Sequence, residues 1–317
     1  MTTQQQKLFD FLVDSLRKER ELTPRDLALM ERLVTHDTFM DLRCDWAFKH
    51  IMYDKEVLMM LIGDVLGEDI VDLELDKLSQ LPNEIDRYFA GDKNATMDVV
   101  AVTKDGSRII VEIQQQRQRV FPSRIHYYGA AMLQSELKKG AAYKKLRPVY
   151  IICFMDYMMD HRTDQLVYRY SMREETSGEQ LSNLMNIYLY ELPRLKKTSM
   201  ESMTAVEGWL YLLKNLHNFA SKPEGMNPRF DKVVDLARFH HLPDEQQYQY
   251  IRAMISEEEK EDLLGGAYDN GYDMGKMEGR EEGREEGREE ALRKTARKMK
   301  EAGSDPAFIE EMTGIVL

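Results

Sequence analysis

The sequence predicts an α/β fold in which helices flank a mixed central sheet and an all-helical C-terminal part follows. Residues 109–113 and 149–154 are almost continuously apolar, which is typical of strands that are covered on both faces. A segment with helical character, residues 121–139, separates them and carries Pro122 in its first turn. The order of elements, a helix, three strands, a helix and a strand, indicates an α/β domain with a central sheet.

The other elements follow from local start signals and periodicity. Residues 3–36 predict two short helices, the second starting at Thr23-Pro24, and residues 54–66 predict an amphipathic helix capped by Asp54. Strands are expected at 70–78, 96–103, 166–170 and 187–192, and helices at 203–219, 231–238 and 243–255.

The composition allows a packed core and many exposed helices, because 43% of the 317 residues are hydrophobic and 32% are charged. The two cysteines, Cys44 and Cys153, match neither a metal-ligand spacing nor a disulfide framework, which fits a reducing compartment. The N-terminus lacks the layout of a signal peptide, and no apolar run approaches the roughly 18 residues of a membrane span. The sequence therefore predicts a cytoplasmic protein without a membrane partner.

The charge is distributed unevenly. A net charge of −12 taken alone argues against nucleic-acid binding. Residues 115–148, however, contain a single acid, Glu136, and eight basic residues: Arg117, Arg119, Arg124, Lys138, Lys139, Lys144, Lys145 and Arg147. This basic segment predicts a surface for anions such as DNA, and the alternative is a solvated helix face.

Two acidic residues, Asp98 and Glu112, lie in otherwise apolar strands, and Gln114 follows Glu112 on the same face. A buried carboxylate is costly unless something pairs with it. Mg²⁺ and Mn²⁺ prefer oxygen ligands, so the two carboxylates, with the carbonyl of Ile113 as a further ligand, predict a divalent metal site. In the alternative reading Asp98 caps the end of its strand and Glu112 pairs with a nearby arginine.

The turn between the two strands decides whether this site can form. With a two-residue turn, Asp98 and Glu112 would point to opposite faces of the sheet. With a three-residue loop at 105–107, or a one-residue bulge, Asp98 would lie opposite Gln114 and share a face with Glu112. The metal site therefore requires the longer loop, and Gly106 supplies the positive φ that such a loop tends to use.

At these residues the sequence resembles a known family. TMDVVAVTKDGSRIIVEIQ resembles the D…ExQ form of the PD-(D/E)XK nuclease motif, in particular the Rpn-like family of recombination-promoting nucleases and related transposases. The resemblance extends from about Cys44 and excludes the residues before about Met40. It also includes DWAFKHIM at 45–52, Arg124, Tyr127, Tyr128, Tyr143, YLYELPRLK at 188–196, the glycine-rich tail and Met312–Gly314.

The resemblance implies a restriction-endonuclease-like core with Asp98 and Glu112 as metal ligands for Mg²⁺ or Mn²⁺. Gln114 stands where the wider superfamily usually has lysine, and an amide cannot supply a positive charge. Either Gln114 only positions a water molecule or another cation provides the charge. Lys49, Arg117 and Arg124 are the candidates for that cation.

Two functions are consistent with this sequence. The first is a metal-dependent DNA endonuclease that acts in recombination, transposition or phage defence. The second is a weakly active or inactive nuclease-fold protein that acts by DNA binding and self-assembly. The expected domains are an N-terminal helical extension (1–40), a nuclease-like domain (41–198), a helical subdomain (199–262) and a charged tail (263–317).

The tail contains an internal repeat, with a glycine at every fourth position from Gly271 to Gly287. As a helix it would be weak, because each glycine costs roughly 1 kcal/mol relative to alanine. A glycine face permits close packing against another backbone, so residues 271–290 predict a homo-oligomer contact. The alternative is a flexible charged linker.

Overall fold

The computed structural model describes residues 1–67, 98–136, 142–159, 163–257, 287, 291–301, 305 and 312–315. The chain forms two compact units, Met1–Glu257 and Glu258–Leu317. The expected strand at 70–78 lies outside the described residues. So does the glycine repeat, apart from the helical Gly287, and self-association through it stays a prediction.

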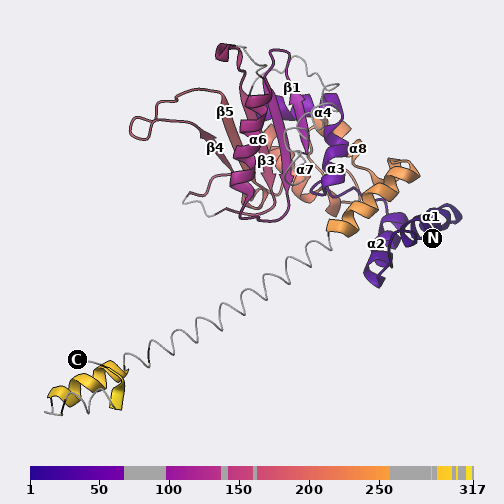
Figure 1. Cartoon of the computed structure of the whole chain (residues 1–317). Helices are drawn as coiled ribbons and strands as arrows, with labels where there is room; N and C mark the ends of the chain where they lie inside the picture. Colours follow the sequence, from indigo (N-terminus) through magenta and orange to yellow (C-terminus); the bar gives the residue numbers. More distant parts are fainter. Residues whose placement is uncertain are drawn as a thin grey trace. The chain divides into compact units, whose positions relative to one another are not determined.

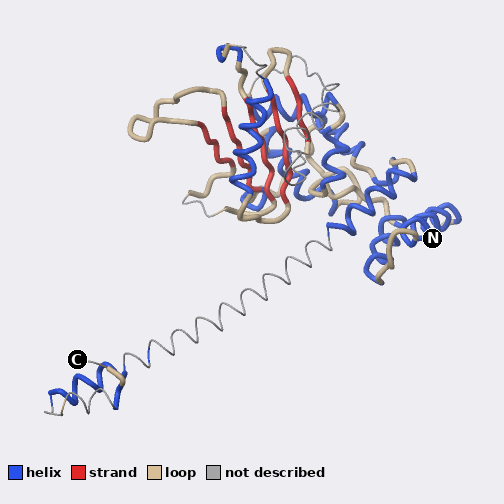
Figure 2. The backbone as a smooth tube through the Cα atoms, in the orientation of Figure 1, coloured by secondary structure: helices blue, strands red, loops and turns tan. Residues whose placement is uncertain are grey.

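A five-stranded sheet forms the centre of the first unit (Figure 2). Its strands are β1 (Val99–Val102), β2 (Arg108–Gln114), β3 (Val149–Met155), β4 (Val167–Ser171) and β5 (Met185–Glu191). Their spatial order is β1-β2-β3-β5-β4. The three central strands run parallel, and β1 and β4 are antiparallel to their neighbours, which confirms the predicted mixed sheet.

One face of the sheet is covered by α6 (Phe121–Glu136), as Figure 1 shows. Ile110 and Ile151 of the sheet pack there against Phe121 and Ile125 of the helix. Gly129 allows this close approach, because a Cβ at this position would lie 2.3 Å from the sulfur of Met185. This face matters for function because even-numbered residues of β2, including Glu112, point toward it.

The opposite face packs against α3 (Asp45–Met52), α4 (Lys55–Leu66) and α7 (Ala205–Asn215). Odd-numbered residues of β2 and the buried side chains of these helices form one large apolar core. The cap of α4 is as predicted: the carboxylate of Asp54 accepts hydrogen bonds from the backbone N–H groups of Glu56 and Val57, both at 3.1 Å. The sheet is therefore buried on both faces, as its apolar strands indicated.

The N-terminal helices are α1 (Thr3–Arg17) and α2 (Pro24–Thr35), and the cap at Thr23 with Pro24 in the first turn is confirmed. The helix predicted at 203–219 is shorter, because α7 ends at Asn215 and a 3₁₀ turn, Leu216–Asn218, follows. After α8 (Asp231–Leu236), residues 244–257 form the last helix described in this unit. Among the described helices, none has the length and apolar character needed to cross a bilayer.

Candidate active site at the ends of β1 and β2

The hairpin between β1 and β2 brings the two predicted carboxylates together. Val99 pairs with Val111 and Val102 with Arg108, and the N–H of Thr103 donates to the carbonyl of Ser107 at 2.9 Å. The loop therefore contains three residues, 104–106, and Gly106 adopts a φ of 91° within it. Continuing this register by one residue sets Asp98 opposite Glu112, on the same face.

The register corrects one detail of the sequence prediction. The three-residue loop comprises residues 104–106 instead of 105–107, so Asp98 lies opposite Glu112 and not opposite Gln114. The carboxylate of Asp105 explains the earlier start of the loop, because it accepts hydrogen bonds from the hydroxyls of Thr103 and Ser107 and closes the turn between them. The face shared by Asp98 and Glu112 is the feature that the metal site requires.

The two carboxylates are buried and held by the backbone. Glu112 is 1% exposed, and its Oε1 accepts a hydrogen bond from the N–H of Asp98 at 3.3 Å. Oδ2 of Asp98 accepts one from the N–H of Ile113 at 2.9 Å. Burial raises the pKa of Glu112 to about 7, and burial together with the charge of Glu112 raises the pKa of Asp98 well above its usual range. Burial therefore disfavours two charged carboxylates here unless a cation lies beside them.

Lys49 lies beside Asp98, although its helix, α3, packs on the face of the sheet opposite to α6. Its Nζ lies 3.4 Å from Oδ1 of Asp98 and 2.7 Å from Oδ1 of Asp45. Burial opposes the charge of the ammonium group, but the two carboxylates raise the pKa of Lys49 on balance. Lys49, one of the three cations considered from the sequence, therefore forms an ion pair with Asp98.

Gln114 is held by an arginine of α6. Its Nε2 donates to the carbonyl of Ile113 at 2.9 Å and to Oε2 of Glu112 at 3.3 Å, and its Oε1 accepts from Nη2 of Arg124 at 2.7 Å. Arg124 also donates to Oε1 of Gln118 at 2.9 Å. Gln114 thus connects Glu112 to a fixed positive charge. The carbonyl of Ile113, predicted as a metal ligand, accepts the hydrogen bond from Gln114 in this arrangement.

Two further residues of the site, Asp45 and Tyr128, were part of the family resemblance but were not assigned a role from the sequence. Asp45 pairs with Lys49 and raises the pKa of Asp98 through a hydrogen bond and its charge. The signal for it was the spacing of four between Asp45 and Lys49 on one helix face. Tyr128 is 2% exposed on the α6 face, and burial and the charge of Glu112 raise its pKa to about 12.

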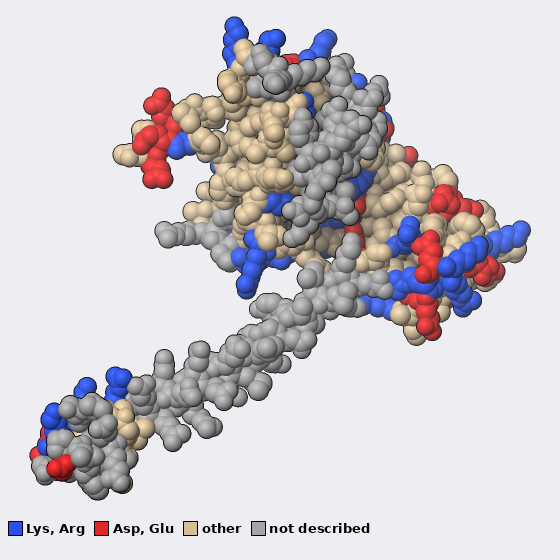
Figure 3. All heavy atoms as spheres, viewed as in Figure 1, with Lys and Arg blue, Asp and Glu red and all other residues tan. Residues whose placement is uncertain are grey.

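The predicted basic segment is divided between two ends of the sheet. Arg117 and Arg119 follow the carboxyl end of β2, the end of the strand near which Glu112 lies, and are exposed. Lys144 and Lys145 precede β3, whose first residue, Val149, pairs with Arg108 at the amino end of β2. Figure 3 shows Lys and Arg side chains above and below the sheet in this view. Lys138 and Lys139 lie outside the described residues.

A known protein family matches most of the chain. The family described as PD-(D/E)XK nuclease family transposase matches residues 42–264. The chain belongs to this family. No curated protein and no solved structure matches the chain significantly.

Membership confirms the predicted family and the restriction-endonuclease-like fold. The match begins at residue 42, after α1 and α2, as the resemblance had indicated. It also extends through the helix at 244–257, so the family unit contains the all-helical part that follows the sheet. The strands that carry Asp98, Glu112 and Gln114 lie within it.

The donor set fits a hard divalent cation. Such ions take one or two carboxylates and complete their shell with water and substrate oxygens. Asp98 and Glu112 supply two carboxylates whose raised pKa values a nearby cation would lower. In the described part of the chain, no group of three or more His, Cys, Asp or Glu side chains forms a complete metal cage. Two carboxylates match the small number of protein ligands that such an ion takes.

Proposed function

We propose that this protein is a metal-dependent DNA endonuclease that hydrolyses phosphodiester bonds. The observation that carries the proposal is the pair of buried carboxylates, Asp98 and Glu112, on adjacent strands, with the ammonium group of Lys49 beside one and the amide of Gln114 beside the other. Nucleases of the PD-(D/E)XK type generally use divalent metal ions, which supports the assignment.

Asp98 and Glu112 would hold Mg²⁺ or Mn²⁺, which when bound stabilises charge on the phosphate and lowers the pKa of a bound water. The ammonium of Lys49, 3.4 Å from Asp98, faces the same space and supplies the positive charge that Gln114 lacks. Gln114 keeps one amide hydrogen bond to Glu112 while Arg124 fixes its oxygen. Lys49 of α3 thereby takes the role that the wider superfamily gives to a lysine at the position of Gln114 in β2.

Supercoiled plasmid provides the direct test. The protein is expected to convert supercoiled plasmid to the nicked form in Mg²⁺ or Mn²⁺ and to leave it intact in EDTA, because the two carboxylates need a cation to act on a phosphate. The Glu112→Ala protein is the control for a contaminating nuclease. Equal nicking by the wild-type and Glu112→Ala proteins would remove the assignment.

DNA binding is expected to depend on the basic residues near the carboxylates. The double variant Arg117→Glu, Arg119→Glu should weaken binding to all sequences and reduce the slope of log K against log[salt] by about 2, because two phosphate contacts are lost. The matched control is Lys144→Glu, Lys145→Glu, with the same change of charge at the amino end of β3. Equal losses of affinity in the two double variants would contradict the expectation that DNA binds at the carboxyl end of β2.

The biological setting of the activity is part of the proposal. The family description favours recombination or transposition, and phage defence would use the same cleavage chemistry. The alternative, a weakly active protein that acts by DNA binding and assembly through residues 271–290, predicts salt-dependent DNA binding without metal-dependent nicking. The plasmid assay and the binding assay together separate the two functions.

A further inference from the structure

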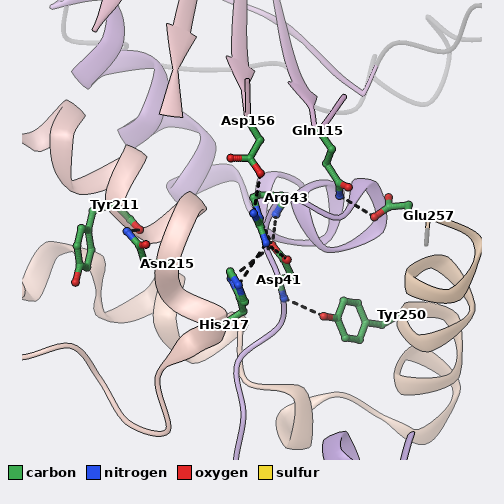
Figure 4. A network of polar contacts seen from close by, with 9 residues as sticks. All are labelled: Asp41, Arg43, Gln115, Asp156, Tyr211, Asn215, His217, Tyr250 and Glu257. Carbon is green, nitrogen blue, oxygen red and sulfur yellow. Dashed lines mark hydrogen bonds and ion pairs between the residues drawn. The ribbon is translucent and has the colours of Figure 1, made fainter. Parts of the chain in front are cut away.

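The helix at 244–257 packs against the segment that precedes and begins α3. The ring of Tyr250 lies 6.1 Å from that of Trp46, and its hydroxyl accepts a hydrogen bond from the N–H of Asp41 at 2.9 Å. Nε1 of Trp46 donates to Oε1 of Gln249 at 3.3 Å. The two hydrogen bonds join residues that are 209 and 203 positions apart in the sequence, so they connect the helical part to the catalytic core. Figure 4 shows the contact between Tyr250 and Asp41.

Glu257, the last described residue of this helix, contacts two elements of the active site. Its Oε1 accepts a hydrogen bond from the backbone N–H of Asp45 at 2.8 Å, and its Oε2 accepts one from Nε2 of Gln115, also at 2.8 Å. Figure 4 shows the second contact, between the end of β2 and the helix. One carboxylate thus joins the first residue of α3 to the residue after Gln114.

The hydrogen bond to Asp45 replaces a missing helix cap. The N-cap residue of α3, Cys44, makes no side-chain capping hydrogen bond. The first N–H groups of a helix have no partner within it, and a negative charge near them is favourable. Glu257 therefore satisfies the first of these N–H groups, that of Asp45, and places a carboxylate at the start of α3 from a distant part of the chain.

The same segment is also fixed from its other side. Arg43, which precedes α3, forms ion pairs with Asp41 at 2.6 Å and with Asp156 at 2.7 Å. The N–H of Asp156 donates to the carbonyl of Gln114 at 2.8 Å. Two sets of contacts therefore connect the start of α3 with the end of β2 (Figure 4). One runs through Arg43 and Asp156, and the other through Glu257.

We infer that Glu257 is a positioning residue that holds α3 and the end of β2 in register, so that Lys49 faces Asp98. Lys49 lies one helical turn after Asp45, and its ammonium group must stay near Asp98 for the proposed nuclease function on which this inference rests. Displacement of a catalytic group by about 1 Å can reduce a rate by about 10²-fold. Glu257 acts through α3 and β2 and does not itself touch the carboxylates.

The test compares Glu257→Ala and Glu257→Gln with Glu245→Ala, a matched control at an exposed position of the same helix. The first readout is independent of activity: amine labelling of Lys49 and hydrogen exchange of residues 45–50, followed by mass spectrometry. In Glu257→Ala both should be faster, by about fivefold for exchange in the first turn, because its cap is lost. Glu245→Ala should match the wild type, and Glu257→Gln should be intermediate because its amide oxygen still accepts from Asp45.

The second readout is the rate of plasmid nicking. In Glu257→Ala, kcat should fall by about 10-fold to 100-fold with KM for DNA unchanged, because Lys49 is misplaced while the DNA-binding surface is intact. Unchanged labelling and exchange would overturn the inference, and so would faster labelling with an unchanged kcat. If the wild type does not nick, the proposed function fails, and faster Lys49 labelling in Glu257→Ala alone then supports the positioning role.

Discussion

Glu112→Gln is expected to abolish plasmid nicking while it stabilises the metal-free protein. Nicking should fall by about 10³-fold, because one of the two carboxylates that would hold the metal is lost and with it several kcal/mol of charge stabilisation in the transition state. The glutamine keeps the size and shape of the side chain, so the core around it is preserved. Loss of activity with gain of stability would mark Glu112 as a functional residue.

The gain in stability follows from the sign of the pKa shift. Burial raises the pKa of Glu112 from 4.5 to about 7 in the folded protein. The wild-type protein therefore loses stability as the pH rises from about 4.5 through 7, whereas the variant has no charge to bury. At pH 8 in EDTA the variant should unfold roughly 7–14 °C higher, since a pKa raised from 4.5 to about 7 corresponds to about 3.4 kcal/mol and each kcal/mol moves the midpoint by about 2–4 °C.

Thermal unfolding in EDTA at pH 5 and pH 8 measures this effect. The difference between variant and wild type should be small at pH 5 and larger at pH 8. Glu179→Gln, an exposed substitution of the same type, should shift the midpoint at neither pH. A Glu112→Gln protein that is less stable than the wild type at pH 8 would show that Glu112 is a paired structural carboxylate, the alternative reading of the strand pattern.

Lys49→Met is expected to reduce the nicking rate by about 10²-fold to 10³-fold with little change in DNA affinity. The substitution keeps an unbranched apolar stem and removes the only ammonium group seen beside Asp98 among the described residues. Loss of a positioned charge at a transition state has a cost of this order. Lys55→Met, an exposed lysine on α4, is the matched control.

The distinction between kcat and KM decides the role of Lys49. A reduced kcat with an unchanged KM indicates that the ammonium group acts in the transition state. A weakened KM with an unchanged kcat would instead place Lys49 among the DNA-binding residues. An unchanged rate would indicate that Arg117 or Arg124, and not Lys49, supplies the positive charge that Gln114 lacks.

Much of the local structure and the two carboxylates could be predicted from the sequence. Apolar runs identified β2 and β3, capping residues identified the starts of α2 and α4, and the motif around Asp98, Glu112 and Gln114 identified the family. Each of these signals lies within a few neighbouring residues, where side-chain periodicity and hydrogen bonding to the nearby backbone dominate. The sequence left the length of the hairpin loop open between two and three residues, and the metal site required the longer loop. The structure has three residues there, and the side chain of Asp105 fixes which ones.

Which distant residues complete the site depends on tertiary packing. Lys49 comes from α3, Arg124 from α6 and Glu257 from the helix at 244–257, so packing on both faces of the sheet brings them to the ends of β1 and β2. Packing also separates Lys144 and Lys145 from Arg117, although one basic segment contains them all. Because β3 runs parallel to β2, the connection between the two strands returns to the end of the sheet where β2 begins, and Lys144 and Lys145 lie at the end of this connection. Local sequence patterns carry no information on such long-range contacts, which depend on how the layers pack together.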